Sequence, residues 1–194
     1  MSSASLIGRW GERPSGVMAG LGLLSGVVSV TWGMSRTSNL DWLQPVAALF
    51  GLAPELLPIG LYYGAAIAAG VWLHTRDWRC MPVLLITTMY AWSAAIQVAI
   101  RTQRHTGDDP HLITASLAAG AVGAGLTHVG CALFAPGLRR PMRIVVTCVV
   151  GAIAGMLFYL GERKIIDEWW LYVIWQPAVA FSIGMGLASR GKDA

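Results

Sequence analysis

The stretch IVVTCVVGAIAGMLFYL, residues 144–160, decides the class of this protein because it is long, apolar and uncharged. A helix needs about 20 mostly apolar residues to cross the roughly 30 Å hydrocarbon core of a bilayer. Five further stretches without Asp, Glu, Lys or Arg lie before and after it. We therefore expect an all-α integral membrane protein, a compact bundle of six transmembrane helices with short loops and a single domain over residues 1–194. The expected spans are residues 16–34, 56–74, 81–100, 112–134, 144–160 and 169–188.

The composition of the 194-residue chain agrees with this class. Apolar residues make up 55% of the chain and charged residues 12%, against about 25% charged residues in a soluble domain. So few charges exclude a disordered chain, a coiled coil and a charged nucleic-acid-binding face. The formal net charge of +4 is therefore assigned to membrane loops, with lipids as partners and no nucleic acid.

The distribution of basic residues predicts an orientation. Nine Lys and Arg fall on the side of the membrane that holds both termini, and five fall on the other side. Because cytoplasmic loops carry the excess of basic residues, both termini are expected in the cytosol. Arg139, Arg140 and Arg143 lie in one short loop, where we expect them to contact anionic lipid headgroups and to fix this topology. The short loops suit a bacterial inner membrane.

One apolar segment does not fit the pattern of spanning helices. Residues 44–54 are apolar but are bounded by Pro45 and Pro54, and they are too few to cross a bilayer. We expect this segment to be interfacial or re-entrant.

Small residues spaced four apart recur in the expected helices and predict close helix packing, because lipid supplies no hydrophobic force between helices. Packing within the bundle and packing in a homo-oligomer are both open. The pairs are Gly16 with Gly20, Gly22 with Gly26, Gly60 with Gly64, Ala119 with Gly123, Ala121 with Gly125, and Gly151 with Gly155.

Three polar side chains stand out inside the expected spans, where polar groups are costly and are candidates for function. They are Gln97, His128 and Gln176, the last between Trp175 and the helix-breaking Pro177. Together with Trp175 they could line a polar pathway. Alternatively, each makes an ordinary interhelical hydrogen bond, for example from Gln176 to His128 or to a hydroxyl group.

Cofactor sites are weakly indicated, and we predict no cofactor. His74 and His128 lie in the same half of the membrane and could ligate one haem iron. His105, Asp108, Asp109 and His111 are ligand types for a transition metal, but a solvated turn with Asp109 and Pro110 starting the next helix explains them as well.

No catalytic motif is present in the sequence, and no carboxylate lies within a span. An enzyme is therefore not favoured. We expect a transporter or channel for a small or neutral solute, with a homo-oligomer as one form. The alternatives are an accessory or assembly subunit of a larger membrane complex and, more remotely, a b-type haem protein.

Overall fold

The computed structural model describes residues 13–34, 41–104 and 109–188, and within these ranges every regular element is helical. Six helices are long and apolar enough to cross a membrane. The prediction of an all-helical chain with six such helices is confirmed. They are α2 (Pro14–Met34), α4 (Leu57–Thr75), α5 (Cys80–Arg104), α6 (Asp109–Phe134), α7 (Pro141–Glu162) and α8 (Trp169–Ala188).

Four short elements join the long helices. In chain order they are η1 (Asp41–Leu43), α3 (Gln44–Leu49), η2 (Pro54–Leu56) and η3 (Pro136–Arg139). Prolines lie in the first turn of several helices, at Pro58 in α4 and Pro141 in α7. The N–H groups of a first turn have no acceptor within the helix, so a proline loses no hydrogen bond there. The C-cap residue of α4 is Arg76, which has a left-handed φ of 58° and donates its N–H to the Trp72 carbonyl.

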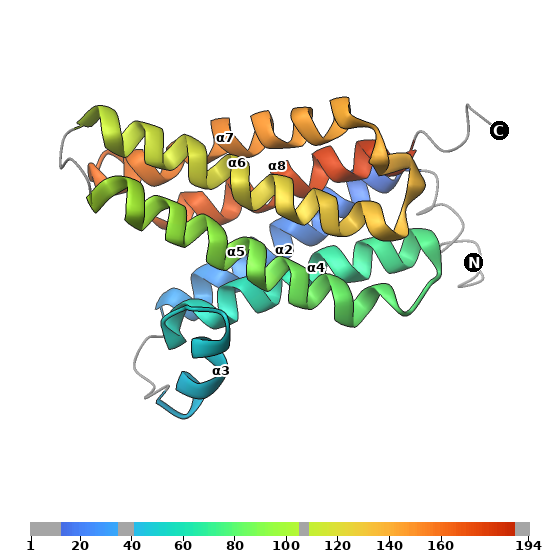
Figure 1. Cartoon of the computed structure of the whole chain (residues 1–194), viewed down its shortest axis with the longest axis horizontal. Coiled ribbons are helices and arrows are strands. Elements are labelled where there is room, and N and C mark those ends of the chain that lie inside the picture. Colours follow the sequence, from blue (N-terminus) through green and yellow to red (C-terminus); the bar gives the residue numbers. More distant parts are fainter. Residues whose placement is uncertain (1–12, 35–40, 105–108, 189–194) are drawn as a thin grey trace.

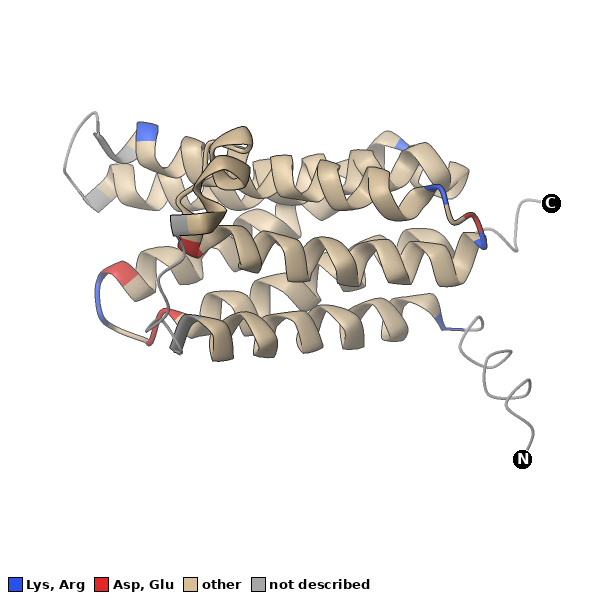
Figure 2. Cartoon of the chain, turned by 90° about the horizontal axis from the view of Figure 1, so that it is seen from below, with Lys and Arg blue, Asp and Glu red and all other residues tan. Residues whose placement is uncertain are grey.

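The six long helices run side by side along one axis (Figure 1), and their contacts follow chain order around a closed ring. Each helix packs mainly on the helices before and after it, and α2 closes the ring against α8. Charged residues of the described ranges gather at the two ends of the ring (Figure 2). We call the end where α4, α6 and α8 begin the hairpin end, and the opposite end, which carries η3, the arginine end.

Glycines bring several ring helices to backbone contact. At the crossing of α6 and α7, a Cβ on Gly120 would lie 2.2 Å from the Gly151 carbonyl oxygen, and one on Gly155 would lie 2.5 Å from that of Ser116. At the crossing of α2 and α8, a Cβ on Gly26 would lie 2.5 Å from the Tyr172 carbonyl oxygen. Only glycine permits these distances, so the packing depends on its missing side chain.

The other expected packing residues fall into two groups. Gly22, Gly60, Gly64, Gly123 and Gly125 each pack against a neighbouring helix of the ring. Gly16 and Gly20, on another face of α2, have no atom of the described chain within 4 Å of a Cβ position. These two glycines therefore take no part in packing among the described helices.

Residues 41–56 form a hairpin of short helices, which we call the 41–56 hairpin. α3 ends in a Schellman turn, with the Leu52 N–H bonded to the Ala47 carbonyl and Gly51 at a φ of 62°. The Phe50 ring lies 5.0 Å from the ring of Tyr90, which is near the middle of α5. Figure 1 shows α3 projecting from the side of the bundle.

Replacing Gly151 by leucine is expected to lower the free energy of unfolding by about 1–3 kcal/mol, because the side chain has to force α6 and α7 apart. Thermal unfolding in mild detergent measures the change. The matched control is Gly20→Leu, which enters open space and should leave the midpoint nearly unchanged. Equal effects of the two substitutions would contradict the packing described.

Candidate functional site

Gln176 joins α8 to α2 through serine hydroxyls. It is 1% exposed, and its Oε1 accepts a hydrogen bond from Ser25 Oγ at 2.5 Å. Its Nε2 donates to Ser29 Oγ at 3.3 Å. Of the two partners considered from sequence, a hydroxyl and His128, the structure places hydroxyls beside Gln176.

His128 holds four elements together at the arginine end. Its Nε2 lies 3.0 Å from the Leu138 carbonyl oxygen in η3, and since a carbonyl only accepts, Nε2 carries the proton. Nδ1 therefore accepts from Thr147 Oγ1 of α7 at 2.8 Å. Ser182 of α8 lies 3.1 Å from the same Thr147 oxygen. Both ring nitrogens are engaged, so a haem iron would have to displace one of these bonds.

Gln97 and its neighbours bind the 41–56 hairpin to α5. Gln97 Nε2 donates to the Gly51 carbonyl at 3.0 Å, and Ser93 Oγ donates to the Phe50 carbonyl. Trp92 Nε1 donates to the Leu56 carbonyl at 3.2 Å. Gln97 and Ser93 thus bond carbonyls at the C-terminal end of α3, where helical partners run out, and Trp92 bonds the carbonyl of the N-cap residue of α4.

The expected pathway residues therefore lie in separate clusters. Gln97 contacts the hairpin, Gln176 contacts α2, and His128 contacts η3 and α7. Trp175 Nε1 donates to the Gly151 carbonyl of α7 at 3.1 Å. The hydrogen bonds of the described chain link none of these four side chains to another, so the geometry does not favour one polar path through them.

Two of the three loop arginines cap helix ends. Arg139 Nε donates to the Ala132 carbonyl at 3.0 Å and its Nη2 to the Leu133 carbonyl at 3.3 Å. Arg143 donates to the Gly137 carbonyl and, at 2.9 Å, to the Gly186 carbonyl of α8. Arg140 is exposed beside them. Sequence reasoning missed this capping role, although a basic residue near a helix C-terminus is its usual signal.

Half of the expected metal site lies outside the described residues. His105 and Asp108 fall in the range 105–108, which the structure does not describe, and Asp109 and His111 lie in the first turn of α6. Within the described residues, no group of three or more His, Cys, Asp or Glu side chains is placed to hold a metal ion. His74 lies in the last turn of α4.

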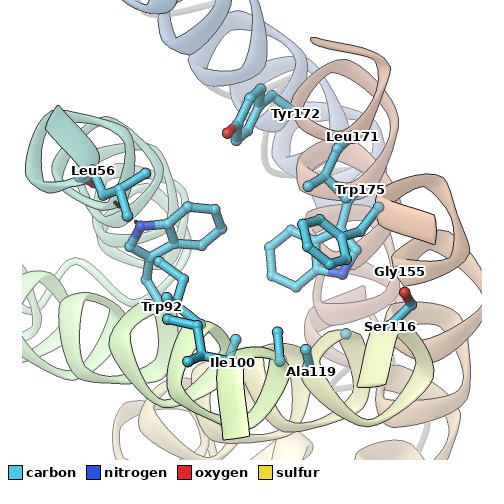
Figure 3. A pocket seen from close by; sticks show the side chains of 14 residues that line it. Leu56, Trp92, Ile100, Ser116, Ala119, Gly155, Leu171, Tyr172 and Trp175 are labelled. Carbon is cyan, nitrogen blue, oxygen red and sulfur yellow. Dashed lines mark hydrogen bonds between the residues drawn. The ribbon is translucent and has the colours of Figure 1, made fainter. Parts of the chain in front are cut away.

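A cavity of about 240 Å³ lies inside the ring at the hairpin end (Figure 3). α5 contributes one face, from Trp92 to Ile100, and α8 contributes Leu171, Tyr172 and Trp175. The remaining walls are Leu56 of η2, the start of α6 around Ala119, and Gly155 and Phe158 of α7. Figure 3 shows Trp92 and Trp175 on opposite sides of the cavity.

The cavity lining is neutral and nearly all apolar. It contains no charged side chain of the described residues. The indole N–H groups of Trp92 and Trp175 are bonded to backbone carbonyls, and the Ser116 hydroxyl donates to the Leu112 carbonyl at 2.7 Å. Such a lining offers contact area and little hydrogen bonding, so it suits a neutral, lipophilic molecule.

Sequence reasoning missed this cavity, although its parts carry a signal. Ala95 and Ala99 on α5 and Ala119 on α6 are small residues that leave space between two large indoles. A run of small residues facing aromatic residues on other helices indicates either close packing or a void. Only the three-dimensional arrangement separates the two.

Known proteins offer no guide to this site. No family model matches the chain, and no curated protein or solved structure is significantly similar to it. The site geometry alone supports the proposals that follow.

Replacing Gln176 by leucine is expected to lower the free energy of unfolding by about 1 kcal/mol, because the link between α8 and the serines of α2 is lost. Thermal unfolding of Gln176→Leu, Ser29→Ala and the double variant measures the coupling between the two residues. The double variant should lose less than the sum of the single variants. Strict additivity would contradict the contact. Thr31→Val, which removes an exposed hydroxyl bonded within α2, is the control and should change little.

Proposed function

We propose that this protein binds one neutral, lipophilic molecule in the cavity and acts as a small membrane carrier for it. The observation that carries the proposal is the uncharged, aromatic-walled cavity of about 240 Å³ inside a ring of helices. This keeps the neutral solute of the sequence-based expectation and moves the site from the polar residues to the cavity.

The volume supports a ligand of limited size. An apolar cavity of roughly 150 Å³ stays dry and takes up benzene, while pockets for drug-sized ligands measure roughly 300–1,000 Å³. A space of about 240 Å³ fits a ring system or part of a hydrocarbon chain. A longer ligand would extend out of the cavity at the hairpin end.

The electrostatics support a neutral ligand. An ion in a low-dielectric site needs a charged or polar partner, and the described lining has no charged residue. Gln97, His128 and Gln176 are engaged with other side chains and with backbone carbonyls, and of the described buried side chains only the Tyr63 and Thr88 hydroxyls have no hydrogen-bond partner. A lipophilic ligand requires none of these groups.

The position of the cavity supports a carrier over an open channel. Toward the arginine end the interior is filled by packed side chains, among them Tyr63, Ile67 and Ile183, each at most 2% exposed. The Tyr63 ring lies 5.4 Å from that of Trp175, so these two rings close the cavity on the interior side. A ligand bound there can reach the other end only if the helices rearrange.

Mild-detergent extraction followed by native mass spectrometry tests the proposal. We expect one small lipophilic molecule per chain in the wild-type protein. In Ala99→Phe, whose side chain enters the cavity, occupancy should fall at least fivefold. Ala65→Phe, at an exposed position of α4, is the control and should retain the ligand. A wild-type protein without bound ligand, or equal retention by both variants, would contradict the proposal.

The same mass spectra test the alternative of an accessory subunit. On α2, no described atom lies within 4 Å of a Cβ placed on Gly16 or Gly20, and we propose that this face packs against a second copy of the chain. A homo-oligomer should therefore accompany the bound ligand. A foreign polypeptide in fixed proportion and no ligand would favour the accessory subunit instead.

We further propose that the protein resides in a bacterial inner membrane with the arginine end in the cytosol, since Arg139, Arg140 and Arg143 share one short connection there. Alkaline phosphatase, which is active only outside the cytosol, tests this orientation as a fusion partner. Fusion after residue 163 should give an active enzyme, and fusion after residue 140 an inactive one. The reverse pattern would overturn the orientation.

A further inference from the structure

The 41–56 hairpin and the cavity share a wall. A small apolar core joins the hairpin to the ring: Ala47 and Leu52 of the hairpin pack with Leu57 of α4 and Met89 of α5. Leu56, Trp92 and Ile96 pack against that core and also line the cavity. A movement of the hairpin away from α5 would therefore change the cavity directly.

The wall is held by three side-chain-to-backbone hydrogen bonds from one helix. Trp92, Ser93 and Gln97 of α5 donate to the carbonyls of Leu56, Phe50 and Gly51. The Schellman turn uses the N–H groups at residues 50–52 for bonds within α3. The hairpin is thus an internally bonded unit that is attached to α5 through these carbonyls.

The other walls of the cavity are held in a different way. α6 and α7 meet at Gly120, Gly151 and Gly155, where backbone touches backbone. α2 and α8 meet in the same manner at Gly22 and Gly26. Separating such helices exposes long stretches of packed surface, whereas the hairpin is released by breaking three hydrogen bonds and a small core. The small core between the hairpin, α4 and α5 is also separate from the main core of the ring.

The outer side of the hairpin faces away from the protein. Trp42 is 73% exposed and Leu49 is 71% exposed, and α3 projects from the side of the bundle (Figure 1). Since Phe50 lies beside the middle of α5, these apolar side chains lie at the depth of lipid chains when the six helices span a bilayer.

We infer that the 41–56 hairpin is a lateral gate through which the ligand passes between the bilayer and the cavity, and that Trp92, Ser93 and Gln97 hold it against α5. This inference rests on the proposed function. It assigns Gln97 and Ser93 a positioning role: they contact the gate and not the ligand. The hairpin stays against α5 at rest because carbonyls released into hydrocarbon have no water to bond.

A disulfide lock tests the gate. A Cβ on Gly51 would lie 3.9 Å from Ser93 Oγ, so Gly51→Cys with Ser93→Cys can form a bond across the hairpin and α5, with Cys148→Ala to remove the native thiol of α7. The control lock is Gly125→Cys with the native Cys148, where the Cβ would lie 2.7 Å from Sγ. The control joins α6 to α7 and leaves the hairpin free.

The probe is the neutral fluorophore N-phenyl-1-naphthylamine, bound to protein in lipid nanodiscs and excited by energy transfer from tryptophan. Its release into empty vesicles is followed by stopped flow. Oxidation of the gate lock should slow release at least tenfold, and reduction should restore the rate. The control lock should change the rate by less than twofold.

A second variant keeps the inference open to refutation if the lock does not form. Gln97→Leu removes one of the three bonds and should speed release about fivefold. Thr87→Val, which removes a hydroxyl bonded within α5, should not. An unchanged release rate in both the oxidised gate lock and Gln97→Leu, in protein that still binds the probe, would overturn the gate. Absence of saturable probe binding to the unmodified protein would overturn the proposed function instead.

Discussion

A polar group buried between apolar helices needs a hydrogen-bond partner from the chain itself, and this requirement organises most of the structure. Polar side chains inside the helices meet it in pairs and small clusters: Gln176 with two serines, His128 with Thr147 and a carbonyl, Gln97 and Ser93 with the turn of the hairpin. Among the described buried side chains, the hydroxyls of Tyr63 and Thr88 do not meet it. Each cluster joins elements that are distant in sequence. In this way polar groups that would be costly in lipid fix which helices lie side by side.

The partnering requirement also explains why an irregular segment can exist at mid-helix depth. The end of α3 leaves carbonyls that have no partner within the helix. Here Ser93 and Gln97 of α5 donate to the carbonyls of Phe50 and Gly51, and Trp92 donates to the carbonyl of Leu56 at the start of α4. These polar residues of α5 thus hold the hairpin beside the cavity, to whose wall Leu56 contributes.

Much of the fold could be predicted from the sequence because helix length and charge distribution depend on neighbours along the chain. The stretch at residues 144–160 is recognisable from its length and its lack of charge, and the arginines after residue 138 mark a connection between helices. The segment at residues 44–54 was recognisable as too short to span. The glycines were recognisable as packing residues, but Gly16 and Gly26 look alike in sequence and only Gly26 meets another helix.

The candidate site was not predictable for a physical reason. In a membrane helix nearly every face is apolar, so no periodic pattern says which face turns inward. The partners of Gln176 lie on a helix at the opposite end of the sequence, and the cavity depends on how Ala99, Trp92 and Trp175 are rotated toward one another. Arg143 likewise reaches Gly186, a carbonyl that no local pattern connects to it.

The closed ring sets an order on the biosynthesis of the protein. α2 is made first and α8 last, yet these two helices share the glycine contact and the serine–glutamine bonds. Until α8 is made, the hydroxyls of Ser25 and Ser29 lack Gln176, and Gly22 and Gly26 lack the helix against which they pack. Five helices thus form an open arc, and the ring closes only when the last segment of the chain has been synthesised.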